Sequence, residues 1–407
     1  MFLSIEEAVN WITSQRNKEI GFDSFQRYLN ENENHLDQLR ILHVAGTNGK
    51  GSTVSMLASC LVEAGYKVGT FTSPHLYEHE DRIRINGTQI PQSDFLRICN
   101  KNKEKWESYH LSMFEMDLEL ASIWFVEQKT DTVILEAGLG GRLDSTNVIV
   151  NPLVSVIVSI GLDHMERLGD TEEKIAYEKA GIIKENGLVI CGEKKLGCVE
   201  VIRNAAENKR AEFVSVKESK ILTSSPLSFE YQNQQYELSS LASYQVSNAS
   251  TAIETLLQCR DRNLLNITDT QLIQGIKKAH WAGRFDVVCT DPLTIVDGAH
   301  NAHGIKALKE SASSLPRPLA VVFACLKDKD KEEMIKTLHD FADEFILTEF
   351  DFYRAMHVDD LVLSYPVKKE KDWKQAIKMA QSKKEGTVLI TGSLYFISEV
   401  MAYFKAE

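Results

Sequence analysis

Short apolar runs alternate with longer stretches of helical periodicity along most of the chain. Residues 132–136 and 154–160 are predominantly apolar, as expected of strands that are buried on both faces of a parallel sheet. Apolar residues recur at helical spacing over 93–105, 114–128 and 171–184. Strands that alternate with helices in this way predict a doubly wound, mostly parallel α/β sheet of the phosphate-loop type.

The same patterns predict the smaller features of this part of the chain. The polar segment 72–80 indicates an exposed loop, and Asn86-Gly87 between two short apolar runs indicates a tight hairpin. Alternating polar and apolar residues over 228–231 and 235–238 predict an antiparallel hairpin appended to the main sheet. Amphipathic helices are further expected over 5–30, 246–259 and 269–279.

A break in periodicity at 280–285 predicts a linker between two domains. Residues 1–279 would form the larger domain, and residues 286–407 a smaller, Rossmann-like α/β domain. Apolar strands recur between helical stretches of the smaller domain, at 293–296, 319–324, 344–347 and 388–391. At 407 residues, the chain is long enough for each domain to bury a core of its own.

The segment 41–53, with the sequence ILHVAGTNGKGST, joins a short apolar strand to a glycine-rich turn and the start of a helix. Glycines let backbone N–H groups curl around phosphate oxygens, and the helix N-terminus adds the positive end of its dipole. Lys50 can reach the outer phosphates, and Ser52 or Thr53 can meet a bound Mg²⁺. The Gly-x-x-Gly-Lys-Gly-Ser spacing is shorter than the common phosphate-loop pattern. A chance glycine-lysine turn is nevertheless the weaker interpretation, and the segment predicts a nucleoside triphosphate site.

Composition and charge narrow the class of protein. A hydrophobic content of 43% and a charged content of 26% are typical of a soluble globular protein. The net charge of −12 argues against nucleic acid as a partner, because its phosphates would be repelled. The seven cysteines form no C-x-x-C pair, and neither a signal peptide nor an apolar run of about 18 residues is present. We therefore expect a cytoplasmic protein without membrane contact.

Polar residues follow several predicted strands, where ligands bind in an open α/β sheet. Glu136 ends a buried strand, so it is expected to meet Mg²⁺ or Arg142, unless it caps a helix. Asp163 and His164 follow the next strand. A lone histidine is more often structural, but the neighbouring strand that ends in Glu136 favours a functional role. Lys179 lies on a downstream helix, and its spacing fits a solvated lysine as well as a functional one.

A second group of polar residues lies in the smaller domain. Asp297, His300 and Asn301 follow the strand at 293–296, and Ser393 follows the strand at 388–391. These residues would face the first domain if the strand-end edges of the two sheets oppose each other.

These motifs closely resemble those of the folylpolyglutamate synthase/dihydrofolate synthase family, which belongs to the Mur ligase superfamily of ATP-dependent amide-forming enzymes. The resemblance covers nearly the whole chain in order, through segments 46–53, 72–75, 114–115, 136–147, 163–164, 178–184, 244–248, 281–285, 297–301 and 391–395. Because so many segments match in sequence order, the resemblance is far more specific than the phosphate loop alone.

The resemblance implies roles for individual residues. The ATP site would comprise the phosphate loop and three later residues, namely Thr47, Asn48, Gly49, Lys50, Gly51, Ser52, Thr53, Asn248, Arg284 and Asp297. Mg²⁺ would be bound by Ser73, Glu136 and His164. The pterin or folate side would comprise Ser112, Phe114, Glu115, Leu143, Asp144 and Ser145. The incoming glutamate would meet Asp297, His300 and Ser393, and the catalytic residues would be Lys50, His164, His300 and a carbamylated Lys179.

The implied reaction passes the γ-phosphate of ATP to a substrate carboxylate, and the amino group of L-glutamate then attacks the acyl phosphate. The substrates would be ATP, L-glutamate and either a reduced folate or dihydropteroate. Mg²⁺ is the implied cofactor, with K⁺ as an additional ion, and a monomer is expected. Two alternatives remain: a Mur-type ligase for a different carboxylate, and a nucleotide-binding relative without catalytic activity.

Overall fold

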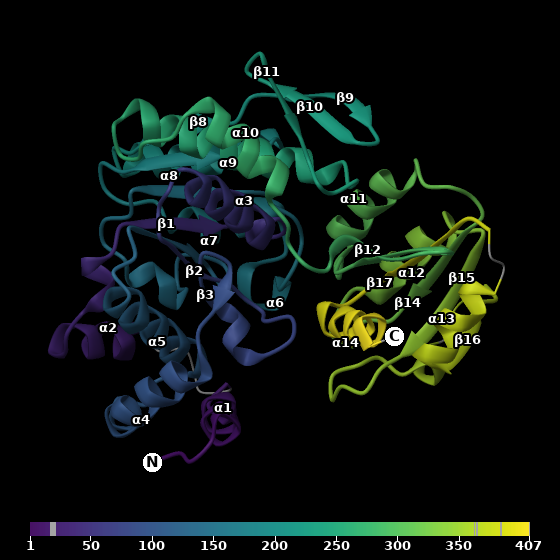
Figure 1. Cartoon of the computed structure of the whole chain (residues 1–407), viewed down its shortest axis with the longest axis horizontal. Coiled ribbons are helices and arrows are strands. Elements are labelled where there is room, and N and C mark those ends of the chain that lie inside the picture. Colours follow the sequence, from purple (N-terminus) through teal and green to yellow (C-terminus); the bar gives the residue numbers. More distant parts are fainter. Residues whose placement is uncertain (17–21, 362, 364, 383–384, 407) are drawn as a thin grey trace. The chain divides into compact units, whose positions relative to one another are not determined.

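The computed structural model describes residues 1–16, 22–361, 363, 365–382 and 385–406, and the chain divides into two compact units (Figure 1). The first unit comprises Met1–Lys220, Glu230–Glu237 and Ser247–Ala279. The second comprises Ile221–Phe229, Leu238–Val246 and His280–Glu407. In the helical segment predicted at 5–30, residues 17–21 lie outside the described residues. On either side of them, α1 (Ile5–Ser14) and α2 (Phe22–Glu31) confirm the prediction.

A mostly parallel sheet of eight strands forms the centre of the first unit, in the order β4-β3-β2-β5-β1-β6-β7-β8. Its strands are β1 (Ile41–Ala45), β2 (Val68–Phe71), β3 (Ile83–Ile85), β4 (Thr88–Gln89), β5 (Thr132–Glu136), β6 (Val154–Ile157), β7 (Leu188–Cys191) and β8 (Glu212–Ser215). The predicted hairpin of β3 and β4 adds an antiparallel edge, and the remaining pairs are parallel. The doubly wound α/β fold is confirmed.

The central strand β1 lies where the strand order reverses. The chain adds β2 and β5 on one side of β1, and β6, β7 and β8 on the other. Val44 of β1 pairs with Glu136 of β5, and Ala45 pairs with Ile157 of β6. Because parallel strands end at the same edge of a sheet, the loops after β1, β5 and β6 meet where open α/β sheets bind ligands.

Helices flank the sheet of the first unit, and several of them pack on it through apolar side chains. They are α3 (Lys50–Glu63), α4 (Gln92–Ser108), α5 (Met113–Glu127), α6 (Met165–Leu168), α7 (Glu172–Ala180), α8 (Leu196–Asn208), α9 (Tyr244–Asp261) and α10 (Asp269–Lys278). Short 3₁₀ helices occur at η1 (His35–Gln38), η2 (His79–Arg82) and η3 (Ser145–Val148). One buried cluster joins the sheet to α1, α2, α4 and α5, and a second joins it to α7 and α8.

Two loop predictions differ from the structure. β6 ends at Ile157 instead of residue 160, because the carbonyl oxygen of Ser159 accepts from the backbone N–H of Thr47 in the loop after β1. The segment 72–80 is not fully exposed, since His79 is buried at its end. The ring nitrogen Nε2 of His79 lies 2.7 Å from Oδ1 of Asp117 on α5, which compensates the imidazole for lost hydration.

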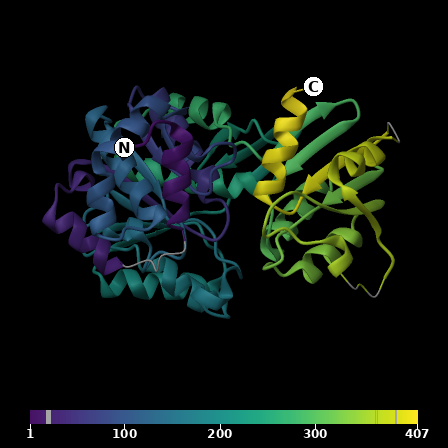
Figure 2. The same ribbon diagram turned by 90° about the horizontal axis from the view of Figure 1, so that it is seen from below.

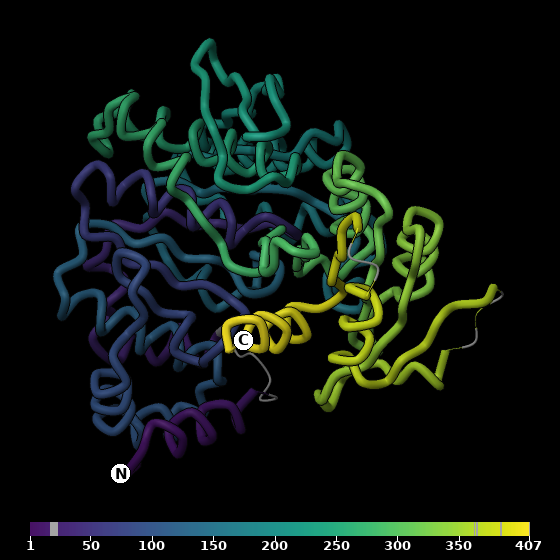
Figure 3. Tube along the Cα trace, turned by 45° about the vertical axis from the view of Figure 1, so that its right-hand side comes forward, coloured from purple at the N-terminus to yellow at the C-terminus, as the bar shows by residue number. Residues whose placement is uncertain are grey.

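A small separate sheet contains the hairpin predicted around Asn233. Its strands β9 (Lys220–Ser224), β10 (Leu227–Tyr231) and β11 (Gln234–Glu237) lie in the order β11-β10-β9, and Figure 3 follows the chain through them in teal. The hairpin therefore does not extend the eight-stranded sheet, and that part of the prediction is wrong. β9 was not predicted, because all five of its residues are exposed and no face is selected for apolar side chains.

The second unit contains a six-stranded sheet in the order β12-β13-β17-β14-β15-β16. Its strands are β12 (Arg284–Thr290), β13 (Leu293–Asp297), β14 (Leu319–Phe323), β15 (Glu344–Glu349), β16 (Lys368–Asp372) and β17 (Thr387–Thr391). β12 is antiparallel to β13, and the other pairs are parallel. The four strands predicted from apolar runs are confirmed, whereas the edge strands β12 and β16 were missed.

Helices α11 (Ala302–Ala312), α12 (Lys331–His339), α13 (Trp373–Gln381) and α14 (Leu394–Ala406), with the 3₁₀ turn η4 (Val358–Asp360), complete the second unit. α14 is the yellow helix that ends beside the label C in Figure 2. Among the residues described in both units, no helix is long and apolar enough to cross a membrane.

Candidate active site

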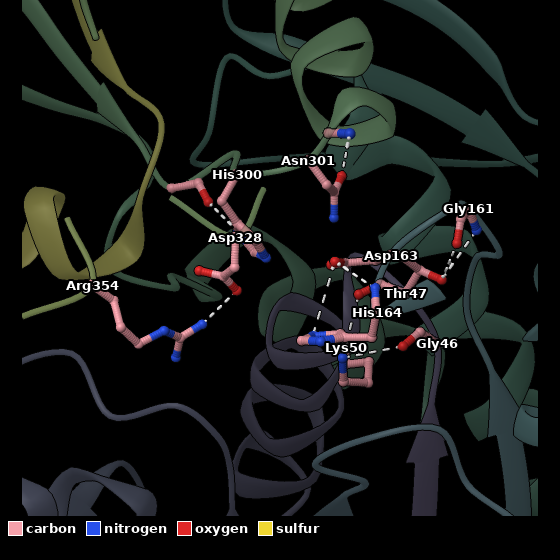
Figure 4. Close-up of polar contacts among 12 residues, drawn as sticks. Gly46, Thr47, Lys50, Gly161, Asp163, His164, His300, Asn301, Asp328 and Arg354 are labelled. Atoms are coloured by element: carbon pink, nitrogen blue, oxygen red, sulfur yellow. Dashed lines mark hydrogen bonds and ion pairs between the residues drawn. The ribbon is translucent and has the colours of Figure 1, made fainter. Parts of the chain in front are cut away.

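The phosphate loop closes through a glycine in the left-handed conformation. Gly49 has a φ of 81° and caps α3, whose first residue is Lys50. A Cβ atom on Gly49 would lie 2.2 Å from Oδ1 of Asn248, so the Asn248 side chain is packed directly against the loop. Lys50 donates from Nζ to the carbonyl oxygens of Gly46 at 3.1 Å and Thr47 at 3.3 Å (Figure 4). The predicted nucleotide-binding residues Lys50 and Asn248 are thus brought together at one loop.

The segment after β6 holds the phosphate loop in place. Thr47 donates from its backbone N–H to the carbonyl oxygen of Ser159 at 2.6 Å, and the Ser159 hydroxyl donates to the carbonyl oxygen of Asn48 at 3.0 Å. The backbone N–H of Gly161 donates to Oγ1 of Thr47 at 3.0 Å (Figure 4). Ser159 and Gly161 were not identified from the sequence. Their only local signal is a small polar residue and a glycine at the end of an apolar run.

The first turn of α3 buries the two hydroxyl side chains that follow Gly51. Ser52 is 2% exposed and Thr53 is fully buried. Oγ1 of Thr53 makes no hydrogen bond within the described part of the chain. A buried hydroxyl without a protein partner at the start of this helix fits a ligand of the phosphate loop, or a water bound to it.

Glu136 forms the acidic part of the site. It ends β5 and is 3% exposed. Its Oε1 lies 3.8 Å from Nζ of Lys50, and its Oε2 accepts from the backbone N–H of Ser73 at 3.3 Å. Arg142 pairs instead with Glu178 at 2.9 Å, so the expected alternative of a Glu136–Arg142 pair is wrong. A buried carboxylate supplies the kind of oxygen ligand that Mg²⁺ prefers, and the backbone of Ser73 lies directly against it.

His164 is placed differently from Glu136. It follows Asp163 in a left-handed conformation with a φ of 51°, and its side chain is 47% exposed. Its backbone N–H donates to Oδ1 of Asp163 at 2.9 Å (Figure 4). Within the described ranges, no group of three or more histidine, cysteine, aspartate or glutamate side chains could hold a metal ion by itself.

Lys179 is buried against the phosphate loop, and its expected alternative as a solvated lysine is wrong. It is 3% exposed and donates from Nζ to the carbonyl oxygen of Gly46 at 2.9 Å. Burial, with a further contribution from the nearby Lys50, lowers the pKa of Lys179 to about 7. Thr171 caps the start of α7 through its side chain and so fixes the helix that carries this lysine. A large fraction of Lys179 is therefore neutral and nucleophilic near neutral pH.

The residues predicted on the folate side occupy two connected segments. Ser112 and Glu115 form a reciprocal capping box at the start of α5. A Cβ atom on Gly138 would lie 2.7 Å from the Phe114 ring, so Phe114 packs over the loop after β5. In that loop Leu143 is 57% exposed, whereas its neighbours Asp144 and Ser145 are buried. Phe114 and the 138–145 loop are thus brought together, and Ser112 and Glu115 also have a structural role.

In the second unit, Asp297 is the centre of a buried polar group. Its Oδ2 accepts from the Tyr244 hydroxyl at 2.6 Å and from the backbone N–H of Phe285 at 3.0 Å. Its Oδ1 accepts from the backbone N–H of Ala299 at 2.8 Å. Arg284 pairs with Asp297 in the β12–β13 register, and its cation opposes the rise that burial causes in the pKa of Asp297. Tyr244 was not identified as a partner of Asp297 from the sequence.

The remaining predicted residues of the second unit lie near the carboxyl ends of its strands. Nδ1 of His300 lies 2.8 Å from the carbonyl oxygen of Gly298. Asn301 caps α11 and accepts from the backbone N–H of Gly304 at 2.8 Å. Ser393, just beyond β17, is 1% exposed. Figure 4 also labels an ion pair of this unit that the sequence did not indicate, Arg354 with Asp328 at 2.6 Å.

A parallel sheet that presents a glycine-rich loop, two lysines and a buried carboxylate at its switch point defines the first unit as a nucleoside triphosphate-binding domain for phosphoryl transfer. Residues 44–256 match the Mur ligase middle domain family, and residues 283–394 match the Mur ligase glutamate ligase domain family.

Individual relatives define the family more closely. The chain is 37% identical to the dihydrofolate synthase/folylpolyglutamate synthase of Bacillus subtilis (strain 168) over 432 residues, with 100% of each chain covered. It resembles E. coli FolC in complex with DHPP and ADP, with a TM-score of 0.86 and 29% identity over 99% of this chain and 98% of that one. A bifunctional folylpolyglutamate synthase/dihydrofolate synthase with Mn, AMPPNP and L-glutamate bound gives the same TM-score and coverage at 28% identity.

The chain belongs to the folylpolyglutamate synthase/dihydrofolate synthase family of Mur ligases. It is an ATP-dependent acid–amino-acid ligase, as the motifs indicated. The comparisons do not favour the two alternatives, a ligase for an unrelated carboxylate and a relative without catalytic activity.

Proposed function

We propose that this enzyme uses ATP to join L-glutamate to a folate substrate. The reaction adds glutamate to dihydropteroate, extends the glutamate tail of a reduced folate, or does both. The burial of Lys179 against the phosphate loop carries this proposal, because its Nζ lies 2.9 Å from the carbonyl oxygen of Gly46. A simple ATP-binding protein has no need for a buried, partly neutral lysine beside its phosphate loop, whereas a ligase can carry a carbamate there.

The chemistry proceeds in two steps. A carboxylate oxygen of the folate substrate attacks the γ-phosphorus of ATP, the bond to the bridging β,γ oxygen breaks, and ADP leaves. The amino nitrogen of glutamate then attacks the acyl carbon, phosphate leaves, and the nitrogen loses a proton as the amide forms. Both steps bring anions together, so fixed positive charge and oriented N–H groups are needed at the transferring phosphoryl group.

Residues of the first unit would supply that environment. Lys50 and the backbone amides of the loop would hold the ATP phosphates, with Asn248 against the loop. Glu136, Ser73 and His164 would hold Mg²⁺, and bound Mg²⁺ would neutralise charge on the phosphate oxygens. Lys179, as its carbamate, would present an anion to a second Mg²⁺. Phe114 and Asp144 would contact the pterin, together with the neighbouring residues predicted for that side.

Residues of the second unit would complete the reaction. Arg284 and Asp297 would contact the nucleotide, and His300 and Ser393 would contact the incoming glutamate.

All seven cysteines are unpaired thiols, which suits a reducing compartment. We therefore also propose that the enzyme works in the cytoplasm. We further propose that it is a monomer, and light scattering on the purified protein would measure its mass in solution.

Glutamate-dependent ADP release tests the proposal. The purified protein would receive ATP, Mg²⁺ and L-glutamate with dihydropteroate in one assay and tetrahydrofolate in a second. ADP release that requires both glutamate and one of these substrates, with a product heavier by one glutamyl residue, is the expected result. No stimulation by either substrate would contradict the assignment. The ratio of the two rates would show which of the two steps the enzyme performs.

An isotope experiment tests the acyl phosphate separately. With ¹⁸O in the substrate carboxylate, the first step moves one labelled oxygen into the bond to phosphorus, and the second step releases it in inorganic phosphate. Mass spectrometry of the phosphate should therefore find one labelled oxygen per turnover. Unlabelled phosphate from an active enzyme would exclude the acyl phosphate while leaving the ligase assignment intact.

A further inference from the structure

A buried histidine interrupts the apolar face of the central strand β1. Alternate residues of a strand share a face, so His43 lies on the same face as Ile41 and Ala45. Ile41 belongs to the buried cluster beneath α4 and α5, Ala45 belongs to the cluster beneath α7 and α8, and His43 lies between them with none of its surface exposed. An imidazole is costly at such a position unless hydrogen bonds compensate it. His43 lies in the segment 41–53 that contains the phosphate loop, but phosphate binding does not explain a histidine at this buried position.

Hydrogen bonds connect this histidine to Asp144 on the predicted folate side. Nε2 of His43 lies 2.8 Å from Oγ1 of Thr146, and Oγ1 of Thr146 lies 2.5 Å from Oδ1 of Asp144. The backbone N–H of Thr146 donates to the same carboxylate oxygen at 3.0 Å, and that of Leu139 donates to the other oxygen at 2.8 Å. Asp144 is therefore held from both sides by residues whose own positions are fixed in the fold.

The proton positions in this chain of hydrogen bonds follow from the donor count. Burial, with the charge of Lys184 nearby, lowers the pKa of His43 to about 3, so the imidazole is neutral and has one N–H. With the proton on Nε2, His43 donates to Thr146, and the single hydroxyl proton of Thr146 is available to Asp144. Nδ1 is then an acceptor, and it has no hydrogen-bond partner among the described residues.

The opposite tautomer is unfavourable. It would bury an N–H group at Nδ1 without an acceptor, and beside an ionised Asp144 it would leave Nε2 and the carboxylate competing for one hydroxyl proton of Thr146. The arrangement therefore selects one pattern of hydrogen bonds, in which His43 donates to Thr146 and Thr146 donates to Asp144. The carboxylate at the end receives hydrogen bonds and donates none.

We propose that His43 and Thr146 are positioning residues for the folate substrate, because they hold Asp144 as an ionised acceptor for the N–H donors of a fused nitrogen heterocycle. The inference rests on the proposed function, which assigns Asp144 to the pterin side of the site. A pterin carries an amino group beside a ring N–H, so it offers N–H donors to Oδ2 of Asp144, the oxygen to which Thr146 does not donate. His43 and Thr146 act through Asp144 and need not touch the substrate.

Replacing the hydroxyl of Thr146 tests the inference most directly. Thr146→Val preserves the shape of the side chain but removes the donor to Asp144 and the acceptor for His43. We expect its Kd for dihydropteroate, measured by calorimetry, to rise about tenfold or more, because hydrogen bonds to charged groups are strong. The Kd for ATP should stay unchanged. Thr146→Ser keeps the hydroxyl and should bind dihydropteroate within about threefold of the wild type.

A matched control separates positioning from a general loss of packing. Thr132 begins β5, at the opposite end of that strand from Glu136, and its hydroxyl donates to the carbonyl oxygen of Arg40 at 2.9 Å. Thr132→Val removes a buried hydroxyl from the neighbouring strand β5 and should leave dihydropteroate binding unchanged. If Thr132→Val and Thr146→Val weakened binding equally, or if Thr146→Val bound like the wild type, the inference would be overturned.

A double-mutant cycle tests whether His43 acts through Thr146. His43→Phe alone should weaken dihydropteroate binding, but the double variant with Thr146→Val should be no weaker than Thr146→Val alone. Additive losses would show two independent structural effects and would overturn the inference. Thermal unfolding of each variant identifies any change in folding.

A wild type that binds neither dihydropteroate nor tetrahydrofolate would contradict the proposed function itself. That result differs from equal binding by the wild type and Thr146→Val, which would contradict only the inference about His43 and Thr146.

The pH dependence gives a readout that a purely structural effect would not change. Burial raises the pKa of Asp144, and the hydrogen bonds from Thr146 and Leu139 oppose that rise. The loss of the Thr146 donor raises the pKa further, so the ratio of variant to wild-type Kd should grow as the pH falls from about 8 to about 6. Two further ionisable groups act on these residues: Lys179 on Asp144 and Lys184 on His43. Both lysines are present in the wild type and in Thr146→Val. A ratio independent of pH in Thr146→Val would contradict an ionised acceptor at Asp144.

Discussion

The backbone N–H of Ser73 donates to Oε2 of Glu136 at 3.3 Å, while Oε1 of the same carboxylate lies 3.8 Å from Nζ of Lys50. Ser73 follows β2, Glu136 ends β5 and Lys50 begins α3, so three separate elements meet at one carboxylate. Two of the three predicted magnesium ligands are therefore in direct contact. The positive charge of Lys50 compensates the Glu136 carboxylate. In the proposed mechanism the same lysine also holds the ATP phosphates.

Glu136→Gln should weaken metal binding without removing the side chain from the site. The amide keeps the shape and one acceptor oxygen but loses the charge that attracts Mg²⁺. We expect the Mg²⁺ concentration for half-maximal ADP release to rise about tenfold or more. The exposed Glu127→Gln at the end of α5 serves as the control, and equal Mg²⁺ dependence in the two variants would exclude Glu136 as a metal ligand.

Lys179→Ala should lower kcat by about 100-fold or more, the scale found when a preorganised charge is removed from an active site. If Lys179 acts as its carbamate, short carboxylic acids should partly restore the rate, because they replace the missing anion. Glutamate-dependent ADP release with and without added acetate measures both effects. Lys174 lies on the same helix with a side chain that is 61% exposed, and Lys174→Ala should change neither rate.

The pH dependence of the wild type should reflect the same lysine. Carbamate formation consumes the neutral amine, and the pKa of Lys179 is lowered to about 7. As the pH falls below that value, the ammonium form accumulates and cannot react with carbon dioxide, so activity should decline and become sensitive to added bicarbonate. An acid limb that bicarbonate leaves unchanged, together with full activity in Lys179→Ala, would remove the carbamate proposal.

Gly49→Ala should abolish tight ATP binding. Gly49 has a φ of 81°, and its new Cβ atom would overlap Oδ1 of Asn248 at 2.2 Å, so both the loop and Asn248 must move. Gly65 provides a matched control, because it has a φ of 88° but no atom lies within 4 Å of the place that a Cβ atom would take. Gly65→Ala should cost only about 1–2 kcal/mol of stability through backbone strain. Equal ATP affinities in the two variants, measured by calorimetry, would contradict the packing of Asn248 on the loop.

Much of the fold and the centre of the site could be predicted because local sequence carries the signal. The glycines of 46–53 and the apolar run that ends in Glu136 each select a conformation through neighbouring residues. Ser159 bonds to Asn48 across 111 positions of the chain, and no local pattern records such a pairing. Helical spacing also could not separate a solvated Lys179 from a buried one, because the loop that covers it comes from a distant segment.

The missed strands have a related cause. β9 and β16 consist mostly of exposed polar residues, so neither alternates between an apolar and a polar face. Each lies at the edge of its sheet, where one side of the strand needs no partner. Their conformation is imposed by hydrogen bonds to the neighbouring strand, and this information lies in the neighbour's sequence.

Tyr244→Phe tests the buried polar group of the second unit. The Tyr244 hydroxyl donates to Oδ2 of Asp297 at 2.6 Å, and its removal leaves the carboxylate with fewer donors. We expect the free energy of unfolding to fall by about 1–3 kcal/mol near neutral pH. Tyr365→Phe is the control in the same unit, since the Tyr365 hydroxyl makes no hydrogen bond with the described residues. It should change the midpoint of urea unfolding much less.

The sign of the pH dependence separates this cause from a packing defect. Burial raises the pKa of Asp297 above its unfolded value, so the folded state binds a proton more tightly than the unfolded state, and stability falls as the pH rises through that interval. Loss of the Tyr244 donor raises the folded pKa further, because that donor favours the charged form. The stability difference between wild type and Tyr244→Phe should therefore be largest at about pH 8 and shrink as the pH falls toward about 4, because protonation of Asp297 removes the need for the Tyr244 donor. A difference that stays constant over this range would mean that Tyr244 contributes through packing alone.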